Sequence, residues 1–225
     1  MSSRSSNDEY GLEKTPRIDY FGDQEASFQK RFSNWRSSVV APAAAPFQRI
    51  GVTPGHITLL GVAFSIPYAI CFFYAKEWTV LFLALYVLMD GLDGAYARVT
   101  KQTSSGGALS DVVADQLGMF VSVVLVIQAG LAQSALAAYY LGAYIAMIAL
   151  SVAQNFLQLP MQPIIRTKYL LYVAVLVWSW FDYSVQFDWL FGIASAIMTF
   201  TSIQSFVRLK RGLDQIPKQT KQGDD

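Results

Sequence analysis

The sequence has few of the residues that enzyme sites most often use, because its 225 residues include one cysteine and one histidine. Cys71 lies in an apolar run and has no second cysteine with which to form an intrachain disulfide or a metal cluster. With His56 alone, neither a histidine-based zinc site nor a Ser-His-Asp triad is expected. The formal net charge is +1, so the composition gives no indication of binding to nucleic acid.

The first 25 residues lack the apolar segment of a cleavable signal peptide. They are polar and charged, which predicts a disordered tail. Residues 211–225 have the same character and are expected to form a second polar tail. The part of the chain that can fold is therefore expected at about residues 26–210.

Long apolar stretches dominate that part of the chain. Hydrophobic residues make up 53% of the sequence and the mean hydropathy is +0.33, which is typical of a polytopic membrane protein. Six stretches approach the ~20 residues that cross the hydrocarbon core, and their backbone groups must be satisfied within helices. The sequence therefore predicts an all-α integral membrane domain with six spans, at about 57–75, 78–97, 107–130, 134–157, 169–185 and 187–207.

Lysine and arginine gather on alternate connections between these spans. They precede the first span, follow the sixth, and occur between the second and third spans and between the fourth and fifth. On the opposite connections the only lysine or arginine is Lys76. The positive-inside rule makes the charged side cytoplasmic. We therefore expect both ends of a multi-pass cell-membrane protein in the cytoplasm, which agrees with an even number of spans.

An amphipathic helix is expected before the first span, at about residues 26–45. Its apolar residues recur at helical spacing, and its basic residues lie off that stripe. The stripe consists of Phe28, Phe32, Trp35 and Val39. A soluble helix would need a soluble domain to pack on, so we favour a helix that lies on the cytoplasmic membrane surface.

Four carboxylates stand next to apolar runs, at Asp90, Asp93, Asp111 and Asp115. An aspartate costs at least ~2.5–3.5 kcal/mol at the centre of a span, so the four together need water or a cation. Helical spacing places Asp90 and Asp93 on one stripe and Asp111 and Asp115 on another. A short connection ending in SSGG lets the two helices run antiparallel, so the carboxylates are expected to meet just below the cytoplasmic surface.

Oxygen-only clusters suit hard cations such as Mg²⁺, Mn²⁺ or Ca²⁺, and two metal ions are a known device for phosphoryl-type displacement. The neighbouring small residues Gly94, Ala97, Gly106 and Gly107 allow a helix or a pyrophosphate to approach closely. Arg98 stands where a cation can pair with phosphate. The pattern thus indicates a phosphate-bearing substrate. A cation or proton pathway, as in a transporter, is the alternative from another class.

The run DGLDGAYARVTKQTSSGGALSDVVAD resembles the signature of the CDP-alcohol phosphatidyltransferase family, D-x2-D-G-x2-A-R-x8-G-x3-D-x3-D. All its fixed positions are met, at Asp90, Asp93, Gly94, Ala97, Arg98, Gly107, Asp111 and Asp115. The resemblance implies transfer of a phosphatidyl-type group from a CDP-lipid such as CDP-diacylglycerol to an alcohol, with release of CMP. It also implies a homodimer.

Residue roles follow from the resemblance alone. The four aspartates would hold two divalent ions, Mg²⁺ or Mn²⁺, and Asp115 would also act as general base. The CDP-lipid site would include the small and basic residues of the signature and the element that opens the first span. Its members are Thr53, Pro54, Gly55, His56, Gly94, Ala97, Arg98, Ser104 and Gly107. At Gly55 and His56 the sequence departs from the residues commoner in the family.

The acceptor alcohol is less well indicated. Arg166, Lys168 and Arg208 lie on the cytoplasmic side and suit a phosphorylated acceptor, although the positive-inside pattern alone would also explain them. We expect glycerol 3-phosphate. Serine, inositol phosphate, another amino-alcohol or a phospholipid are the alternatives. Gln116 stands where glycerophosphate and cardiolipin synthases commonly have lysine. Residues 151–159 lack the basic residues that tend to occur in inositol-phosphate synthases.

Overall fold

The computed structural model describes residues 37–38, 40–42, 44–157, 159, 167–181 and 186–215. The two polar tails predicted at 1–25 and 211–225 lie wholly or largely outside these ranges. The four apolar residues of the expected interfacial stripe and Arg166 also lie outside them. Within the described ranges the chain is helical and contains no strand, which confirms the predicted all-α class.

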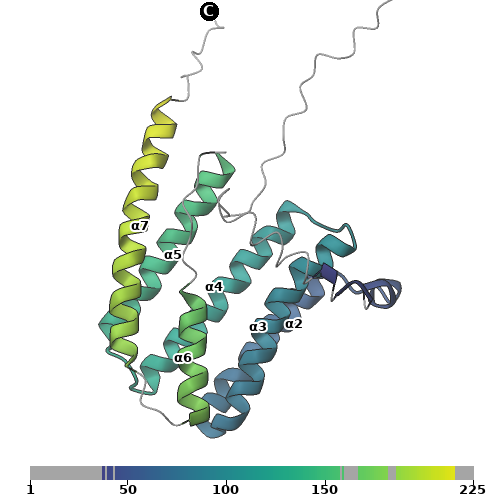
Figure 1. Ribbon diagram of the computed structural model, residues 1–225, viewed down its shortest axis with the longest axis horizontal. Coiled ribbons are helices and arrows are strands. Elements are labelled where there is room, and N and C mark those ends of the chain that lie inside the picture. The colour runs from purple at the N-terminus through teal and green to yellow at the C-terminus, as the bar shows by residue number, and fades with distance from the viewer. Residues whose placement is uncertain are drawn as a thin grey trace, which may run out of the picture.

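Within the described part of the chain, six long helices run up and down through the molecule (Figure 1). Each begins close to its predicted start, and the last runs past its predicted end. They are α2 (Pro54–Tyr74), α3 (Lys76–Val99), α4 (Ser105–Gln128), α5 (Ser134–Phe156), α6 (Lys168–Phe181) and α7 (Phe187–Gln215). α2 packs on α3 and α4, α5 packs on α4 and α7, and α6 packs on α3 and α4.

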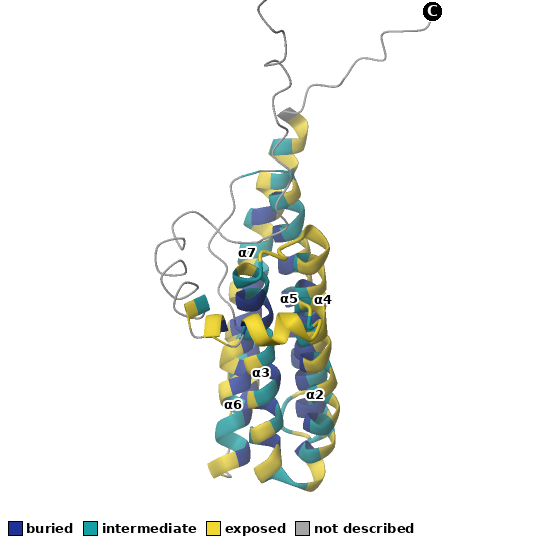
Figure 2. Ribbon diagram, turned by 90° about the vertical axis from the view of Figure 1, so that its right-hand side faces the viewer, coloured by how far each residue is buried: buried dark blue, intermediate teal, exposed yellow. Residues whose placement is uncertain are grey.

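Five of these helices are long and apolar enough to cross a membrane, which makes the chain a multi-pass membrane protein. The exception among the described helices is α6, whose 14 residues span about 21 Å, less than the ~30 Å of hydrocarbon. The count of six spans is therefore not confirmed. Exposed residues recur along the helices (Figure 2). On α2 they include the apolar residues Leu59, Ile66 and Ile70, as expected where the surroundings of a span are lipid.

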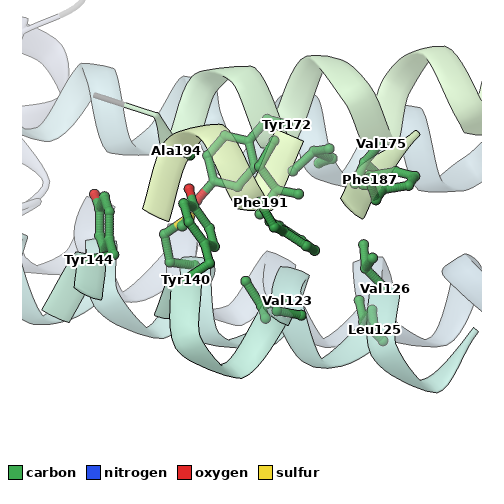
Figure 3. Close-up of a cluster of buried hydrophobic side chains, with 14 of the residues drawn as sticks. Val123, Leu125, Val126, Tyr140, Tyr144, Tyr172, Val175, Phe187, Phe191 and Ala194 are labelled. Carbon is green, nitrogen blue, oxygen red and sulfur yellow. The ribbon is translucent and has the colours of Figure 1, made fainter. Parts of the chain in front are cut away.

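The main core draws buried residues from α2 through α7, and Figure 3 shows the part of it that lies among α4, α5, α6 and α7. Val123 and Val126 of α4 face aromatic residues from the later helices, and the Tyr140 and Phe191 rings stack with centroids 4.9 Å apart. Tyr140, Tyr144 and Tyr172 gather at one end of this cluster. Because Tyr172 follows Lys168 by one helical turn, these tyrosines lie toward the start of α6.

Close approach between α2, α3 and α4 depends on two glycines. A Cβ on Gly61 would lie 3.0 Å from the Met89 Cβ. A Cβ on Gly118 would lie 1.9 Å from the Tyr86 hydroxyl oxygen, which donates a 3.1 Å hydrogen bond to the Ala114 carbonyl. The Tyr86 ring therefore crosses the face of α4 where a side chain would otherwise stand.

The chain before α2 is also anchored to α3. Residues 44–49 form helix that lies beside the start of α2 (Figure 1). Val40 and Ala44 are buried against Ala95 and Tyr96, and the Tyr96 hydroxyl donates a 2.8 Å hydrogen bond to the Val52 carbonyl. Packing against protein at this point fixes the path by which the chain enters the first span.

Candidate active site

The four aspartates lie on two neighbouring helices, Asp90 and Asp93 in the second half of α3 and Asp111 and Asp115 in the first half of α4. Asp93 is 3% exposed and Asp115 is 5% exposed, whereas the other two are partly exposed. The expected meeting of all four carboxylates at a common depth stays a prediction.

A lysine from a third helix reaches into this group. Lys168, the first residue of α6, is 1% exposed, and its ammonium forms ion pairs with Asp90, at 3.2 Å, and with Asp115. The sequence led us to expect Lys168 at an acceptor site. Its contact with the carboxylates was missed, because 78 and 53 positions separate it from these partners. The sequence signal that could have indicated this contact was the position of Lys168, a lysine next to an apolar span with no acidic residue nearby in the sequence.

Hydrogen bonds hold Asp93 from two directions. The Thr58 hydroxyl of α2 donates to Asp93 Oδ2 at 2.6 Å, and the Gly94 amide donates to Oδ1 at 2.6 Å. Thr58 also donates to the Pro54 carbonyl at 3.2 Å, which fixes its position on the first turns of α2. Thr58 was not among the site residues expected from the sequence.

The residues expected on the CDP side lie at or near the start of α2, the end of α3 and the start of α4, and most of them are exposed. A Cβ on Gly94 would lie 3.5 Å from Arg98 Nη1, so the guanidinium folds back along α3 over this glycine. Ala97 lies beside it on the same helix. The Ser104 side chain caps α4 by accepting a 3.0 Å hydrogen bond from the Gly107 amide.

Thr53, Pro54, Gly55 and His56 form the start of α2. The Thr53 side chain accepts from the His56 amide at 3.4 Å, and His56 Nδ1 accepts from the Thr53 amide at 3.2 Å, which makes a capping box. Pro54 occupies the first turn, where its missing N–H costs little. The imidazole of His56 thus already has a structural role, and its expected contact with cytidine stays a prediction.

A small cavity lies between α2, α3 and α4. Its volume is about 10 Å³, comparable to the ~10–15 Å³ that one water molecule needs. Its lining includes both aspartates of α3 and consists of Thr58, Gly61, Val62, Tyr86, Asp90, Asp93 and Ala114. This space suits a water molecule or a metal ion and is far too small for a nucleotide.

The chemistry of the donor set fits a hard divalent ion, since all the ligands are carboxylate oxygens and two of them already share a cation, the Lys168 ammonium. Among the described residues, however, no three carboxylates come close enough together to hold one ion. A metal ion would therefore have to draw these side chains together. Arg208 is exposed on α7, which packs against α5, while Arg166 lies outside the described residues.

Comparison with known proteins gives one family. Residues 51–204 match the family model described as CDP-alcohol phosphatidyltransferase. A phosphatidylinositol phosphate synthase from Streptomyces avermitilis is 38% identical over 81 residues, which are 35% of this chain and 33% of that protein. The phosphatidylinositol phosphate synthase of Mycolicibacterium smegmatis is 35% identical over 79 residues, 34% of this chain and 36% of the relative.

A protein of the same name from Mycobacteroides abscessus is 30% identical over 83 residues, 36% of this chain and 38% of the relative. The chain thus spans about a third of the length of the curated relatives that it matches. No solved structure matches the chain. The family model covers well over half of the sequence, including all four aspartates, and the chain belongs to the CDP-alcohol phosphatidyltransferase family.

Proposed function

We propose that the chain transfers a phosphatidyl group from a CDP-lipid, such as CDP-diacylglycerol, to a phosphorylated alcohol of the inositol phosphate class, and releases CMP. The observation that carries the proposal is a complete family signature, within which Asp90 of α3 and Asp115 of α4 share the Lys168 ammonium. The proposed reaction takes place at the cytoplasmic face of the cell membrane, where the basic connections lie.

Donor binding is assigned to the cytoplasmic ends of α2, α3 and α4. The Arg98 guanidinium, exposed above Gly94, can pair with a pyrophosphate oxygen. The starts of α2 and α4 add backbone amides and the positive end of a helix dipole, which favour an anion. Thr53, Gly55, His56, Ser104 and Gly107 would border the bound CDP group, and the lipid tails would lie along the apolar outer faces.

The family uses divalent metals, and the donor set suits Mg²⁺ or Mn²⁺. Bound by Asp90, Asp93, Asp111 and Asp115, two such ions would supply positive charge that offsets the pyrophosphate and the developing charge on CMP. The Thr58 and Gly94 hydrogen bonds fix Asp93 in place, so that this carboxylate is oriented before any ligand arrives.

Asp115 is the proposed general base. Its carboxylate takes the proton from the acceptor hydroxyl while that oxygen forms a bond to the phosphorus bearing the lipid. The bond from this phosphorus to the bridging oxygen breaks, and CMP leaves with that oxygen and the electron pair. Burial of Asp115 supports the proposal, because a base shielded from bulk water favours transfer to the alcohol over hydrolysis.

The proposed acceptor rests on the basic residues of this chain and on the names of its relatives. The expected glycerol 3-phosphate acceptor is not confirmed, and the named relatives favour the inositol phosphate alternative. Lys168 and Arg208 are cations on the cytoplasmic side that can contact an acceptor phosphate, with Arg166 nearby in sequence. We further propose that the chain acts as a homodimer, as the family resemblance implies.

The test uses purified full-length protein in mixed micelles with CDP-diacylglycerol and Mg²⁺. Inositol phosphate, glycerol 3-phosphate, inositol and serine are offered one at a time, and CMP release and the lipid product are measured. The proposal predicts product with inositol phosphate and much less with the others. Rapid turnover of glycerol 3-phosphate or serine would overturn the acceptor assignment. Metal or proton flux in liposomes, without CMP release from CDP-diacylglycerol in the presence of any of these acceptors, would overturn the proposed transferase activity.

A further inference from the structure

Lys168 places a fixed positive charge where a metal ion is expected. Its ammonium is 3.2 Å from Asp90 Oδ2 and also bonded to Asp115 Oδ1, so it bridges one carboxylate of α3 and one of α4. Both side chains belong to the set that the family signature assigns to divalent ions. The same two carboxylates are therefore partners of the Lys168 ammonium and expected ligands of a divalent metal ion.

The lysine is held in this position by its surroundings. It is buried at the start of α6, and the preceding residue, Thr167, forms a 2.9 Å hydrogen bond with the Tyr140 hydroxyl of α5. The Lys168 ammonium also lies 5.0 Å from the centre of the Tyr169 ring. A buried ammonium requires charged partners, and these two carboxylates supply them. The ion pairs thus connect α6 to α3 and α4 at the depth of the site.

A divalent ion and this ammonium cannot hold the same oxygens in the same place. Cation–cation repulsion is strong in a site with little water, and a carboxylate that neutralises one charge is less able to neutralise another. The separation of the carboxylates agrees with this competition, because no three acidic side chains in the described part of the chain come together at one point.

We propose that Lys168 is an internal competitor of the divalent ions, a positioning residue that holds Asp90 and Asp115 until metal binding displaces it. This inference rests on the proposed function, because it takes the two aspartates as metal ligands. Once displaced, the ammonium is free to contact the phosphate of an acceptor. Binding of metal and of a phosphorylated acceptor should therefore favour each other, since both draw Lys168 away from its carboxylates.

The first test measures Mn²⁺ binding to the purified full-length protein by calorimetry, without any lipid or acceptor. Lys168→Met should bind Mn²⁺ at least about tenfold more tightly than the wild type, because the competitor is gone. Lys168→Arg keeps the charge and should stay closer to the wild type. Lys101→Met removes an exposed cation of the same side and should leave Mn²⁺ affinity unchanged. Unchanged or weaker Mn²⁺ binding by folded Lys168→Met would overturn the inference.

A second measurement needs no variant and so remains decisive if Lys168→Met does not fold. The wild-type protein is treated with a small amine-reactive reagent with EDTA or with saturating Mn²⁺, and Lys168 labelling is quantified by mass spectrometry. Labelling should rise several-fold with Mn²⁺, while Lys101 labelling stays constant. Equal labelling of Lys168 in both conditions would overturn the competition.

The two proposals fail separately. Suppose that CMP release requires metal and inositol phosphate, but that Mn²⁺ affinity is the same in the wild type and in Lys168→Met. The proposed competition is then refuted, and the proposed function stands. If the wild-type protein neither binds Mn²⁺ nor releases CMP with any acceptor, both proposals fall.

Discussion

The Thr58 hydroxyl on α2 donates a 2.6 Å hydrogen bond to the Asp93 carboxylate on α3. The two residues are 35 positions apart, and Asp93 is nearly inaccessible to solvent. A buried carboxylate that loses a donor is costly, whereas a surface one is not. The hydrogen bond therefore both joins two spans and orients one of the expected metal ligands toward the cavity between α2, α3 and α4.

Replacing Thr58 with valine should destabilise the protein and lower its activity. Valine keeps the shape and removes the donor, so the free energy of unfolding should fall by about 1–3 kcal/mol. CMP release should fall with it, because Asp93 is no longer held by α2. Thermal unfolding in micelles and CMP release measure the two effects. Thr58→Ser retains the hydroxyl and is the matched control; equal behaviour of valine and serine variants would refute the assigned role.

Asp115→Asn tests the proposed general base. Asparagine is nearly isosteric and cannot accept the proton, so CMP release with CDP-diacylglycerol should be almost completely lost. Insertion into the membrane should be retained, because Asp90 remains paired with the buried Lys168 ammonium. Asp188→Asn, at the start of α7 on the opposite side of the membrane, is a control that removes one carboxylate far from the site. Wild-type CMP release by Asp115→Asn would remove Asp115 from its assigned role.

Chelation should abolish transfer, since the charge of the pyrophosphate would then face carboxylates of the same sign. CMP release is measured after treatment with EDTA and again after addition of excess Mg²⁺ or Mn²⁺. Activity should return with either ion. A protein that keeps full activity in EDTA would contradict the assignment of the four aspartates as metal ligands.

Local features of the sequence were sufficient for much of the fold. The predicted helix starts follow from hydropathy, which depends on residues next to one another in the chain. Thr53 and Ser104, which we expected at the CDP-lipid site, also cap α2 and α4. The joint depth of Asp90 and Asp115 follows from helical spacing on both sides of one short connection. These features depend on nearby residues only, so they can be predicted without knowing how the helices pack.

Contacts between distant segments were not accessible in the same way. The position of Lys168 beside Asp90 depends on how α6 packs against α3 and α4, which hydrophobic periodicity does not specify because every span is apolar on several sides. Basic residues near the ends of spans also obey the positive-inside rule, and this masks any individual role. Thr58 was missed for a related reason, since a lone threonine in a span usually bonds to its own helix.

Gly118→Ala should destabilise the helix packing beside the site without changing any polar group. The added Cβ would lie 1.9 Å from the Tyr86 hydroxyl oxygen and 2.2 Å from its ring carbon, so Tyr86 must move away from α4. Overpacking of this kind costs about 1–3 kcal/mol, and the hydrogen bond to the Ala114 carbonyl would be lost as well.

Gly142→Ala is the matched control, because nothing lies within 4 Å of the Cβ added there. Thermal unfolding should show a clear loss for Gly118→Ala and little change or a small gain for Gly142→Ala, since alanine is the better helix former. Equal stability of the two variants would mean that Tyr86 does not cross α4 at this glycine.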